Sequence, residues 1–320
     1  MLSRVADSLY WMSRYLERAE HTARLLGVNL TQMLDQTPES SERRWDRLLL
    51  SLRTGTPNGG PHDAYSITNT LTFDASNDAS IAALITAARA NARQVREQIS
   101  TEMWEQLNRL YLKVGRSNMD EIWHAEPYEF FLIVKERAQF FHGVTDATMT
   151  HGEGWQFIQV GRFLKRACVT ADLLDVYFRA FVETQNHSTE LIDYMEWVAL
   201  LKSCTSFEAY CKVYTANIQP HAVAEFLLLN AESPRSVRFA AEMVQTALQA
   251  IAKETRTRYA GRAERVAGRL RASLNYGQVD EIMADNMHQY LENIQSQCAH
   301  IHTAIKEAYI AYPIDTALAS

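Results

Sequence analysis

The chain has 320 residues, of which 47% are hydrophobic and 22% are charged, and this balance excludes a disordered protein. Its formal net charge of −6 disfavours nucleic acid as the main partner, because binding to phosphates requires a basic surface. With only 12 glycines and 7 prolines, the sequence favours long helices over a β protein with many turns. The sequence therefore predicts an all-α protein built as a multi-helix bundle.

The amino-terminal segment carries charged side chains throughout its first twenty residues, which argues against a signal peptide. No uncharged apolar run approaches the roughly 18 residues that a membrane-spanning helix needs. The cysteines form no Cys-x-x-Cys pair, and Cys204 and Cys211 lie too far apart along one predicted helix for a disulfide. We therefore expect a cytoplasmic protein with reduced thiols and no membrane partner.

A long helix is predicted at the start of the chain, with Ser3 as its N-cap. One apolar stripe follows the spacing of a helix face: Val5, Leu9, Met12, Leu16, Ala19, Ala23 and Leu26. The other side mixes charged, aromatic and apolar residues: Tyr10, Trp11, Arg14, Glu17, Arg18, His21 and Leu25. Because a solvated face does not normally carry two large aromatic side chains, we expect this helix to be buried on most sides, with its charges enclosed between helices.

These enclosed charges have two interpretations. Burying a charged group is costly unless it is paired and hydrogen-bonded, so the simpler interpretation is a structural salt bridge between helices. The alternative is a pocket that binds a carboxylate or a phosphate, because the planar guanidinium group of arginine binds such anions bidentately. On the second interpretation, Trp11, Arg14, Glu17 and Arg18 are candidate binding residues, and Glu17 is the candidate acid or base.

The next helix is predicted to begin near Trp45, and glycines and prolines between Thr54 and Ser66 predict a surface loop after it. Further along, the segment from Asn91 to Glu105 is dense in charge. The favoured interpretation of this segment is a solvated helix face. On the alternative interpretation, Arg93 and Arg96 line the same interior as the charges of the first helix and join the binding site.

The sequence contains an internal repeat. Arg14–Leu26 recurs 148 positions later as Arg162–Leu174, with eight of thirteen residues identical. Two further matches keep their order at offsets of 152 and 156, the first at Trp45 and Trp197 and the second at Leu71 and Leu227. We therefore predict two tandem copies of one helical unit, at residues 1–150 and 151–320, joined between residues 143 and 154 into one continuous domain.

The second copy keeps Arg162 and Arg166 but has Lys165 where the first copy has Glu17, so its charged cluster is more positive and favours an anion site. Later in this copy, Ser233 and Pro234 are predicted to cap a helix. Gly277 is predicted to precede a long last helix that ends near Pro313.

The sequence lacks the residue spacing of known metal-binding sites. A di-metal carboxylate bundle needs Glu-x-x-His on two helices, whereas Glu17 and His21 are four residues apart and have no equivalent in the second copy. Cys298 and His302 share a helix face, but no second cluster has a matching spacing. No phosphate-binding glycine loop or nucleophile elbow occurs. We expect no metal and no cofactor.

Several segments together resemble the alpha-E family, bacterial all-helical proteins named for an E-R motif in the first helix. The matching segments span nearly the whole chain: Leu2–Glu20, Asn91–Glu97, Gly152–Phe157, Gly161-Arg162 and Ser233–Val237. The motif positions fall on Glu17 and Arg18. Lys165 departs from the pattern, since this family often repeats the Glu-Arg pair at that point.

The resemblance implies partners rather than an activity. The resemblance implies that family members are genomic companions of circularly permuted ATP-grasp proteins and of transglutaminase-like proteases. Some family members are fused to the ATP-grasp protein. This association implies a peptide- or amide-forming system in which the ATP-grasp protein activates a carboxylate. Our first hypothesis is a helical accessory subunit that docks the ATP-grasp protein and helps to hold a carboxylate-bearing substrate. The alternative is an enzyme in its own right, with Glu17 as acid or base and an arginine clamp.

Overall fold

A computed structural model describes residues 1–32, 38–54, 63–184, 190–255 and 260–310. Within these ranges the chain is helical and contains no strand, which confirms the all-α prediction. The first half contains the following helices: α1 (Ser3–Gln32), α2 (Pro38–Leu52), α3 (Ala64–Thr72), α4 (Ile81–Gln94), α5 (Thr101–Gly115), α6 (Met119–His124) and α7 (Pro127–Thr148).

The second half follows a similar order of long and short helices. Its elements are α8 (Glu153–Thr184), α9 (Glu190–Ser203), α10 (Phe207–Tyr214), α11 (Pro220–Leu229), α12 (Val237–Thr255), α13 (Ala260–Tyr276), α14 (Val279–Asp285), α15 (Met287–Ile305) and a π-helical turn, η2 (Lys306–Ile310). This order is compatible with the tandem duplication, which stays a prediction.

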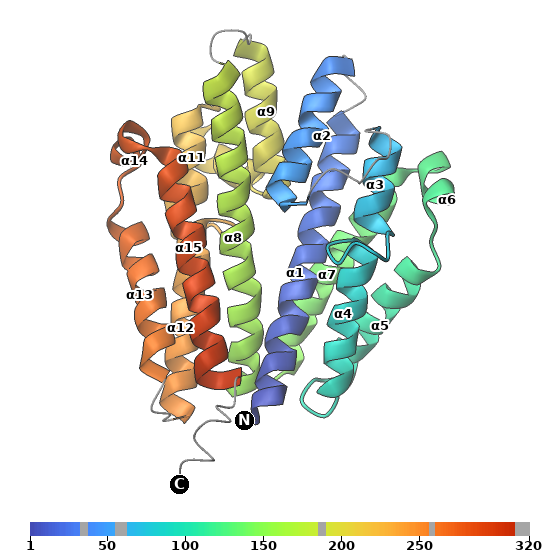
Figure 1. The fold of residues 1–320 in the computed structure, drawn as a ribbon, viewed down its shortest axis with the longest axis vertical. Helices are drawn as coiled ribbons and strands as arrows, with labels where there is room; N and C mark the ends of the chain where they lie inside the picture. The colour runs from blue at the N-terminus through green and yellow to red at the C-terminus, as the bar shows by residue number, and fades with distance from the viewer. Residues whose placement is uncertain (33–37, 55–62, 185–189, 256–259, 311–320) are drawn as a thin grey trace.

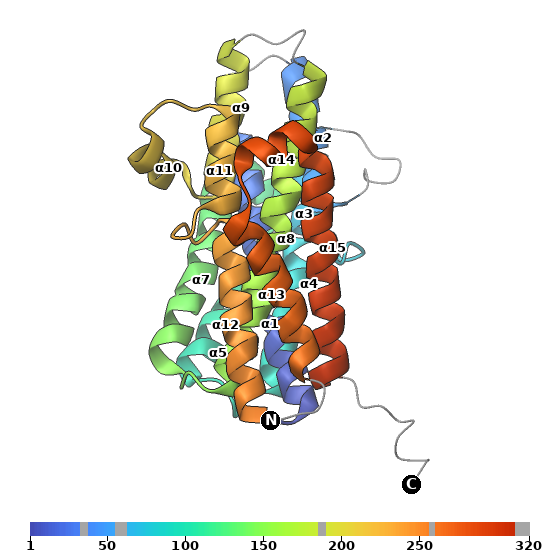
Figure 2. The same ribbon diagram turned by 90° about the vertical axis from the view of Figure 1, so that its left-hand side faces the viewer.

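The long helices form two four-helix groups that lie side by side (Figure 1). In one group, α1 packs on α4 and α7, and α5 also packs on α4 and α7. In the other group, α8 packs on α12 and α15, and α13 also packs on α12 and α15. Helices α1 and α8 pack directly against each other and join the two groups. Figure 2 shows that α7 and α15 lie on opposite sides of the α1–α8 pair.

Several contacts at the upper end of the molecule cross between the halves. Helix α2 packs on α8, and α9 packs on α1. Arg44 and Arg47 of α2 both pair with Glu196 of α9, at 2.8 and 2.9 Å. The connection between the halves is residues 149–152, shorter than the predicted segment 143–154, because α7 continues to Thr148. These contacts favour one continuous domain; the boundary at 150/151 stays a prediction.

One hydrophobic core extends through both halves. The predicted apolar stripe of α1 is buried along its whole length, and Tyr10 and Leu25 on the other side are buried as well. This confirms that α1 is enclosed on most of its circumference. Among the largest fully buried side chains are Tyr10, Phe131, Phe157 and Phe226, which come from both halves. Burial of this apolar surface, at roughly 25 cal/mol per Å², is the main force that holds α1 and α8 together.

Helix ends differ from the predictions at several points. Ser3 is the first helical residue, and the Leu2 carbonyl accepts from the amides of Val5 and Ala6, so Leu2 takes the N-cap position. Helix α2 begins at Pro38, seven residues before Trp45. The observed starts differ from the predicted ones because the first turn of a helix carries little apolar periodicity.

The predicted loop and the carboxyl end also need correction. Of the predicted loop between Thr54 and Ser66, residues 64–66 belong to α3, which Asp63 caps through the amide of Ser66, and residues 55–62 lie outside the described residues. Pro313, the predicted end of the last helix, also lies outside them. No helix in the described part of the chain is long and apolar enough to cross a membrane.

Candidate functional site: a buried carboxylate cluster between the two halves

The site is positioned by the crossing of α1 and α8. A Cβ atom on Gly161 would lie 2.2 Å from Ser13 Oγ and 2.3 Å from the Tyr10 carbonyl oxygen, so only glycine permits this approach. Beyond the crossing the helices run in parallel, because Ser13 is opposite Gly161 and Glu17 is opposite Arg166. Side chains one turn beyond Gly161 therefore face side chains one turn beyond Ser13.

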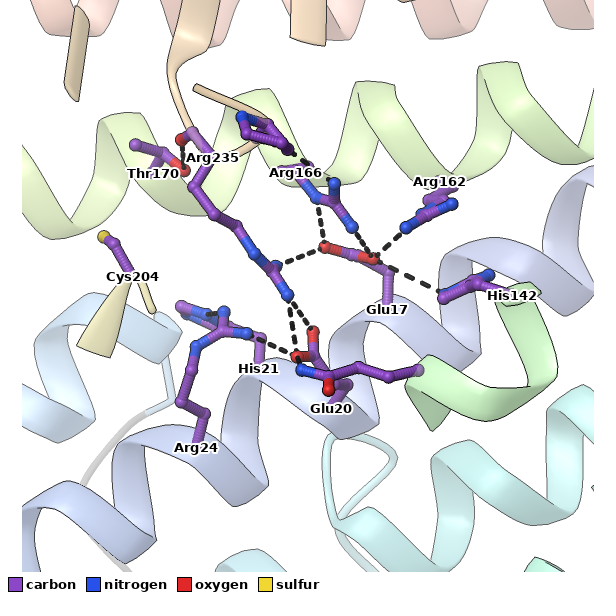
Figure 3. A network of polar contacts seen from close by, with 12 residues as sticks. Glu17, Glu20, His21, Arg24, His142, Arg162, Arg166, Thr170, Cys204 and Arg235 are labelled. Carbon is purple, nitrogen blue, oxygen red and sulfur yellow. Dashed lines mark hydrogen bonds and ion pairs between the residues drawn. The ribbon is translucent and has the colours of Figure 1, made fainter. Parts of the chain in front are cut away.

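Glu17 lies at the centre of the interface and has no exposed surface. Arg166 of α8 binds it bidentately, with Nε 2.7 Å from Oε1 and Nη2 2.9 Å from Oε2. Arg235 adds a third bond, from Nη1 to Oε1 at 2.8 Å (Figure 3). Burial alone would raise the pKa of Glu17, but the two guanidinium groups outweigh it and hold the pKa well below its usual range. Glu17 is therefore a carboxylate.

Glu20, one turn further along α1, completes the arrangement. Arg235 Nη2 lies 2.7 and 3.0 Å from its two oxygens, and Arg24 Nη1 lies 2.6 Å from Oε1. Arg24 also donates from Nε to the Ser203 carbonyl at the end of α9. Burial raises the pKa of Glu20, yet Arg235 and Arg24 lower it to about 2. We call the set Glu17, Glu20, Arg24, Arg166 and Arg235 the carboxylate cluster.

Arg235 reaches the carboxylate cluster from the turn before α12, not from a helix. The Ser236 amide donates to the Ser233 carbonyl, and Ser236 Oγ accepts from the Phe239 amide, so Ser236 caps α12 in place of the predicted Ser233. Two side chains of α8 hold the turn. Arg166 Nη1 donates to the Pro234 carbonyl at 3.1 Å, and Thr170 Oγ1 donates to the Arg235 carbonyl at 3.1 Å.

Two buried histidines border the carboxylate cluster. His142 of α7 has Nε2 3.8 Å from Glu17 Oε2, and His21 has Nδ1 3.1 Å from Arg24 Nη2. Burial, followed by nearby cations, lowers the pKa of each histidine well below its ordinary value of 6.5; these cations are Arg24 and Lys165 for His21, and Arg162 for His142. Both rings are therefore neutral at pH 7, and they add no charge to the cluster.

The positive charges exceed the negative ones at this interface. Glu17 and Glu20 face the three arginines of the carboxylate cluster, and Arg162 Nε lies 3.9 Å from Glu17 Oε2. Burial and the charge of Arg166 lower the pKa of Arg162 to about 10, so it too is a cation at pH 7. Every oxygen of the two carboxylates already accepts at least one short bond from a guanidinium group. The arrangement suits a rigid joint better than a proton-transfer site.

Of the predicted site residues, Glu17, Arg162 and Arg166 come together. Arg14 and Trp11 lie on the side of α1 that faces α15: Arg14 Nη1 donates to Tyr10 Oη at 2.8 Å, and its guanidinium carbon lies 5.3 Å from the centre of the Trp11 ring. Trp11 also contacts His302 of α15, with 5.4 Å between ring centres. Arg14 and Trp11 are therefore outside the carboxylate cluster.

The second residue of the E-R motif also lies outside the carboxylate cluster. Arg18 is partly exposed, and burial together with the charge of Arg14 lowers its pKa. The two residues of the motif thus face different surroundings, although they are neighbours in the sequence. Consecutive helical residues point about 100° apart, which accounts for the difference.

The predicted residues Arg93 and Arg96 do not reach the interior. The charge-dense segment is not one helix, because α4 ends at Gln94 and α5 begins at Thr101. Arg93 is exposed, and Arg96 donates to Thr101 Oγ1 at 3.3 Å. The solvated interpretation of these two residues agrees with the structure.

The sequence-based prediction missed Glu20, Arg24 and Arg235. Glu20 and Arg24 have the four-residue spacing of a helical ion pair, and Glu20 follows Glu17 by one turn, so a signal was present. For Arg235 the only signal was its place in the family segment Ser233–Val237. Its bond to Glu17 joins residues 218 positions apart, so no local pattern predicts it. Within the described residues, no group of three or more His, Cys, Asp or Glu side chains could hold a metal ion.

A groove of about 820 Å³ lies beside the carboxylate cluster, between α1, α7 and the end of α9. Its wall includes Phe131 and Tyr128 from α7, Lys202 from α9, and Arg24. The groove thus shares one residue with the carboxylate cluster, but Glu17 and Glu20 do not line it.

Comparison with known proteins gives a family but no solved structure, since none matches. Residues 1–310 match the alpha-E model, described as a predicted alpha-helical domain with a conserved ER motif. Uncharacterised proteins of Mycobacterium bovis and of two Mycobacterium tuberculosis strains are 24% identical over 329 residues, which covers 95% of this chain and 36% of each relative. The chain thus spans about a third of the length of these relatives. With a match over nearly its whole length, the chain belongs to the alpha-E family.

Proposed function

We propose that the chain is a helical accessory subunit of an ATP-grasp-dependent system that forms peptide or amide bonds. The observation that carries the proposal is that this chain spans only 36% of its mycobacterial relatives. In those proteins the alpha-E region is one part of a larger chain, as expected for a module that acts together with another domain. We propose that this chain acts beside such a domain in the same way, and that the ATP-grasp protein supplies it.

The proposed partner is a circularly permuted ATP-grasp protein, with a transglutaminase-like protease as a further member of the system. The ATP-grasp partner would activate a carboxylate with ATP, and the helical subunit would help to hold the carboxylate-bearing substrate. A cytoplasmic location belongs to the same proposal, because the reaction consumes ATP and the four cysteines of the chain are free thiols.

The carboxylate cluster supports a subunit over an enzyme that uses Glu17. A general acid or base needs contact with its substrate and a pKa near the working pH. Glu17 has no exposed surface, and its arginine partners keep its pKa well below the ordinary range. The catalytic alternative stays a prediction. It would require the cluster to open during the reaction.

Co-purification tests the proposal. The tagged chain and the circularly permuted ATP-grasp protein of the same organism are produced together and applied to size-exclusion chromatography at micromolar concentration. We expect one peak that contains both proteins, and ATP consumption with carboxylate and amine substrates that rises when the helical chain is added. Separate elution together with unchanged ATP consumption would contradict the proposal.

A second measurement separates the two hypotheses. We expect no turnover by the helical chain alone. In the complex, Glu17→Asp is the informative variant, because it keeps the charge but shortens the side chain. If it lowered turnover at least about a hundredfold, the loss expected for a general acid or base, with the melting temperature and the complex unchanged, Glu17 would be catalytic and the accessory role would be wrong.

A further inference from the structure

Three cationic side chains gather on the opposite side of the α1–α8 pair, toward α15. They are Arg14 and Arg18 of α1 and Lys165 of α8, and we call them the cationic cluster. Arg14 contacts Tyr10, whose hydroxyl lies 2.7 Å from His302 Nδ1 of α15, which places Arg14 on that side. Arg18 follows Arg14 by one turn of α1 and so lies on the same face of the helix. The charges act on one another: burial lowers the pKa of Lys165, and Arg18 and Arg14 lower it further, against the opposing effects of Cys168 and Asp172.

The cationic cluster occupies positions that correspond to those of the carboxylate cluster. At the offset of 148 residues, Arg14 and Arg18 correspond to Arg162 and Arg166, and Lys165 corresponds to Glu17. In the carboxylate cluster an arginine of one central helix grips a carboxylate of the other, with Arg166 bidentate on Glu17. In the cationic cluster the position of that carboxylate holds a lysine, so the counter-ion is replaced by a third cation.

The turn that supplies Arg235 also has a counterpart. Ser80 caps α4 through the Ala83 amide at 3.2 Å, as Ser236 caps α12. The residue before Ser80 is Ala79, where the second half has Arg235. The short side chain of alanine cannot reach toward the α1–α8 pair, so this side lacks the arginine that fills the space between the carboxylates on the other side.

No carboxylate in the described part of the chain forms an ion pair with Arg14, Arg18 or Lys165. Arg14 Nε is buried and has no hydrogen-bond partner. The nearby carboxylate of Asp172 is bound by Arg53, at 2.7 and 3.1 Å. Asp78 attracts Arg18 but is exposed, so water screens its charge.

The cationic cluster differs from the carboxylate cluster in access. Arg14, Arg18 and Lys165 are each partly exposed, whereas Glu17 and Glu20 are at most 1% exposed. Beside Arg14, the partly exposed rings of Trp11 and Tyr15 stack with 5.2 Å between their centres. A ligand could therefore reach the cations from solvent and place an apolar portion against these rings.

We infer that the cationic cluster binds the carboxylate group of a small amino-acid or peptide substrate. The inference rests on the proposed function, and it names the part of the subunit that would hold the substrate. On the other side, Arg166 binds Glu17 across the α1–α8 interface, and Arg162, one turn before it on α8, lies 3.9 Å from the same carboxylate. An external carboxylate would supply to Arg14 and Arg18 the counter-ion that Glu17 supplies to Arg162 and Arg166.

Binding to the purified full-length chain tests the inference. The probes are the tripeptide Ala-Ala-Ala with a free carboxyl terminus, the same tripeptide as its carboxyl-terminal amide, and inorganic phosphate. Titration calorimetry is performed at an ionic strength of about 0.01 M, where the Debye length is about 30 Å and charge interactions are least screened. We expect the free acid to bind and the amide to bind at least about tenfold more weakly, the loss expected for a charge-assisted contact.

Three variants locate the site. Arg18→Gln should weaken binding of the free acid at least about tenfold, and Lys165→Glu should abolish it, because an internal carboxylate would then occupy the place of the ligand. Arg93→Gln is the matched control, since it removes one positive charge from the exposed surface of α4, and binding should change less than about twofold. Melting curves establish that each variant is folded.

Three outcomes would overturn the inference. These are no binding of the free acid, equal binding of acid and amide, and equal weakening by Arg93→Gln and Arg18→Gln. Binding of phosphate without binding of the tripeptide would overturn the carboxylate assignment. Because these titrations use the helical chain alone, their failure leaves the docking result with the ATP-grasp protein unaffected, and failure to dock leaves the titrations unaffected.

Discussion

The two sides of the α1–α8 pair use similar residues for opposite arrangements of charge. On the α7 side, Glu17 and Glu20 are enclosed and every oxygen is bonded to an arginine. On the α15 side, Arg14 and Arg18 lie partly exposed beside Lys165. The two sides differ at more than one corresponding position, because Lys165 replaces Glu17 and Ala79 replaces Arg235. The α15 side therefore lacks both the internal carboxylate and the arginine that joins the two carboxylates on the α7 side.

The E-R motif of the family spans both sides. Glu17 belongs to the carboxylate cluster and Arg18 to the cationic cluster, so one dipeptide supplies the joint between the halves and part of the proposed binding site. A buried carboxylate that loses its partners costs several kcal/mol, whereas a partly exposed cation can be solvated. Substitutions at these two neighbouring positions should therefore have very different effects on stability.

The largest expected effect is on the stability of the α7 side. Glu17→Gln leaves Arg166 and Arg235 buried without a full counter-charge, and the free energy of unfolding should fall by about 3–5 kcal/mol. Arg18→Gln, one residue away, should lower it by less than about 1 kcal/mol, because Arg18 is partly exposed and forms no ion pair in the described residues. Urea denaturation of both variants measures the difference, and equal losses would contradict the contrast between the two sides.

The next effect is a dependence on pH, to which His21 and His142 of the α7 side and His302 of α15 contribute. Burial, followed by the charges of Arg14 and Lys306, lowers the pKa of His302 to about 4. His21 and His142 have depressed pKa values in the folded state, so below pH 6.5 the unfolded chain binds more protons and folding weakens. Each histidine should remove up to about 1.4 kcal/mol per pH unit as the pH falls below 6.5. Below pH 4.5, protonation of Glu20 adds to the loss as the pH falls toward its folded pKa of about 2.

Urea denaturation between pH 7 and 5 measures this dependence. His142→Leu removes one of the three histidines with a depressed pKa without introducing a charge, so the slope of stability against pH should fall by about a third. His151, exposed in the connection between the halves, provides the matched control, and His151→Leu should leave the slope unchanged. An unchanged slope in His142→Leu would show that His142 is not a source of the acid sensitivity.

A smaller effect concerns the thiol beside the cationic cluster. A hydrogen bond from Cys298 and then, against burial, the charges of Lys165 and Arg14 lower the pKa of Cys168 to about 7. Cys298→Ala should raise this pKa toward the ordinary value of 9.0 and slow alkylation of Cys168 at pH 7 by roughly tenfold.

Iodoacetamide labelling followed by peptide mass spectrometry gives the alkylation rate of each cysteine over pH 6–9. Cys211 is also partly exposed and serves as the internal reference within the same protein. Lys165→Gln should slow Cys168 less than Cys298→Ala does, because the hydrogen bond is the larger influence on the pKa. A Cys168 rate that both variants leave unchanged would show that the thiol does not sense the cationic cluster.

The smallest expected effect is a gain in stability on the α15 side. Lys165→Glu gives Arg14 and Arg18 the carboxylate that their counterparts have, and the melting temperature should rise by a few degrees, as expected for a gain of up to about 1 kcal/mol at a partly exposed site. Lys165→Gln removes the repulsion without adding a carboxylate and should give a smaller rise. A lower melting temperature in both variants would mean that Lys165 is stabilised by its surroundings, and the cationic cluster would not need an external anion.

The sequence by itself determined the all-α fold, the burial of α1 and membership of the alpha-E family. These depend on local patterns: the apolar stripe of α1 follows helical spacing, and the family segments are short runs of adjacent residues. The same patterns placed Glu17 among enclosed charges and favoured a solvated face for Arg93, which nevertheless stayed a candidate binding residue. They also suggested the repeat of Arg14–Leu26 at 162–174, and the duplication stays a prediction.

Only the tertiary structure decided which charges meet. Arg235 binds Glu17 across 218 positions, and Arg24 of α1 reaches the carbonyl of Ser203 at the end of α9. These contacts depend on the close crossing at Gly161 and on the turn that precedes α12, neither of which has a helical period. An ion pair requires its atoms to approach within a few ångströms, and periodicity gives the face of a helix without giving the neighbour that the face meets.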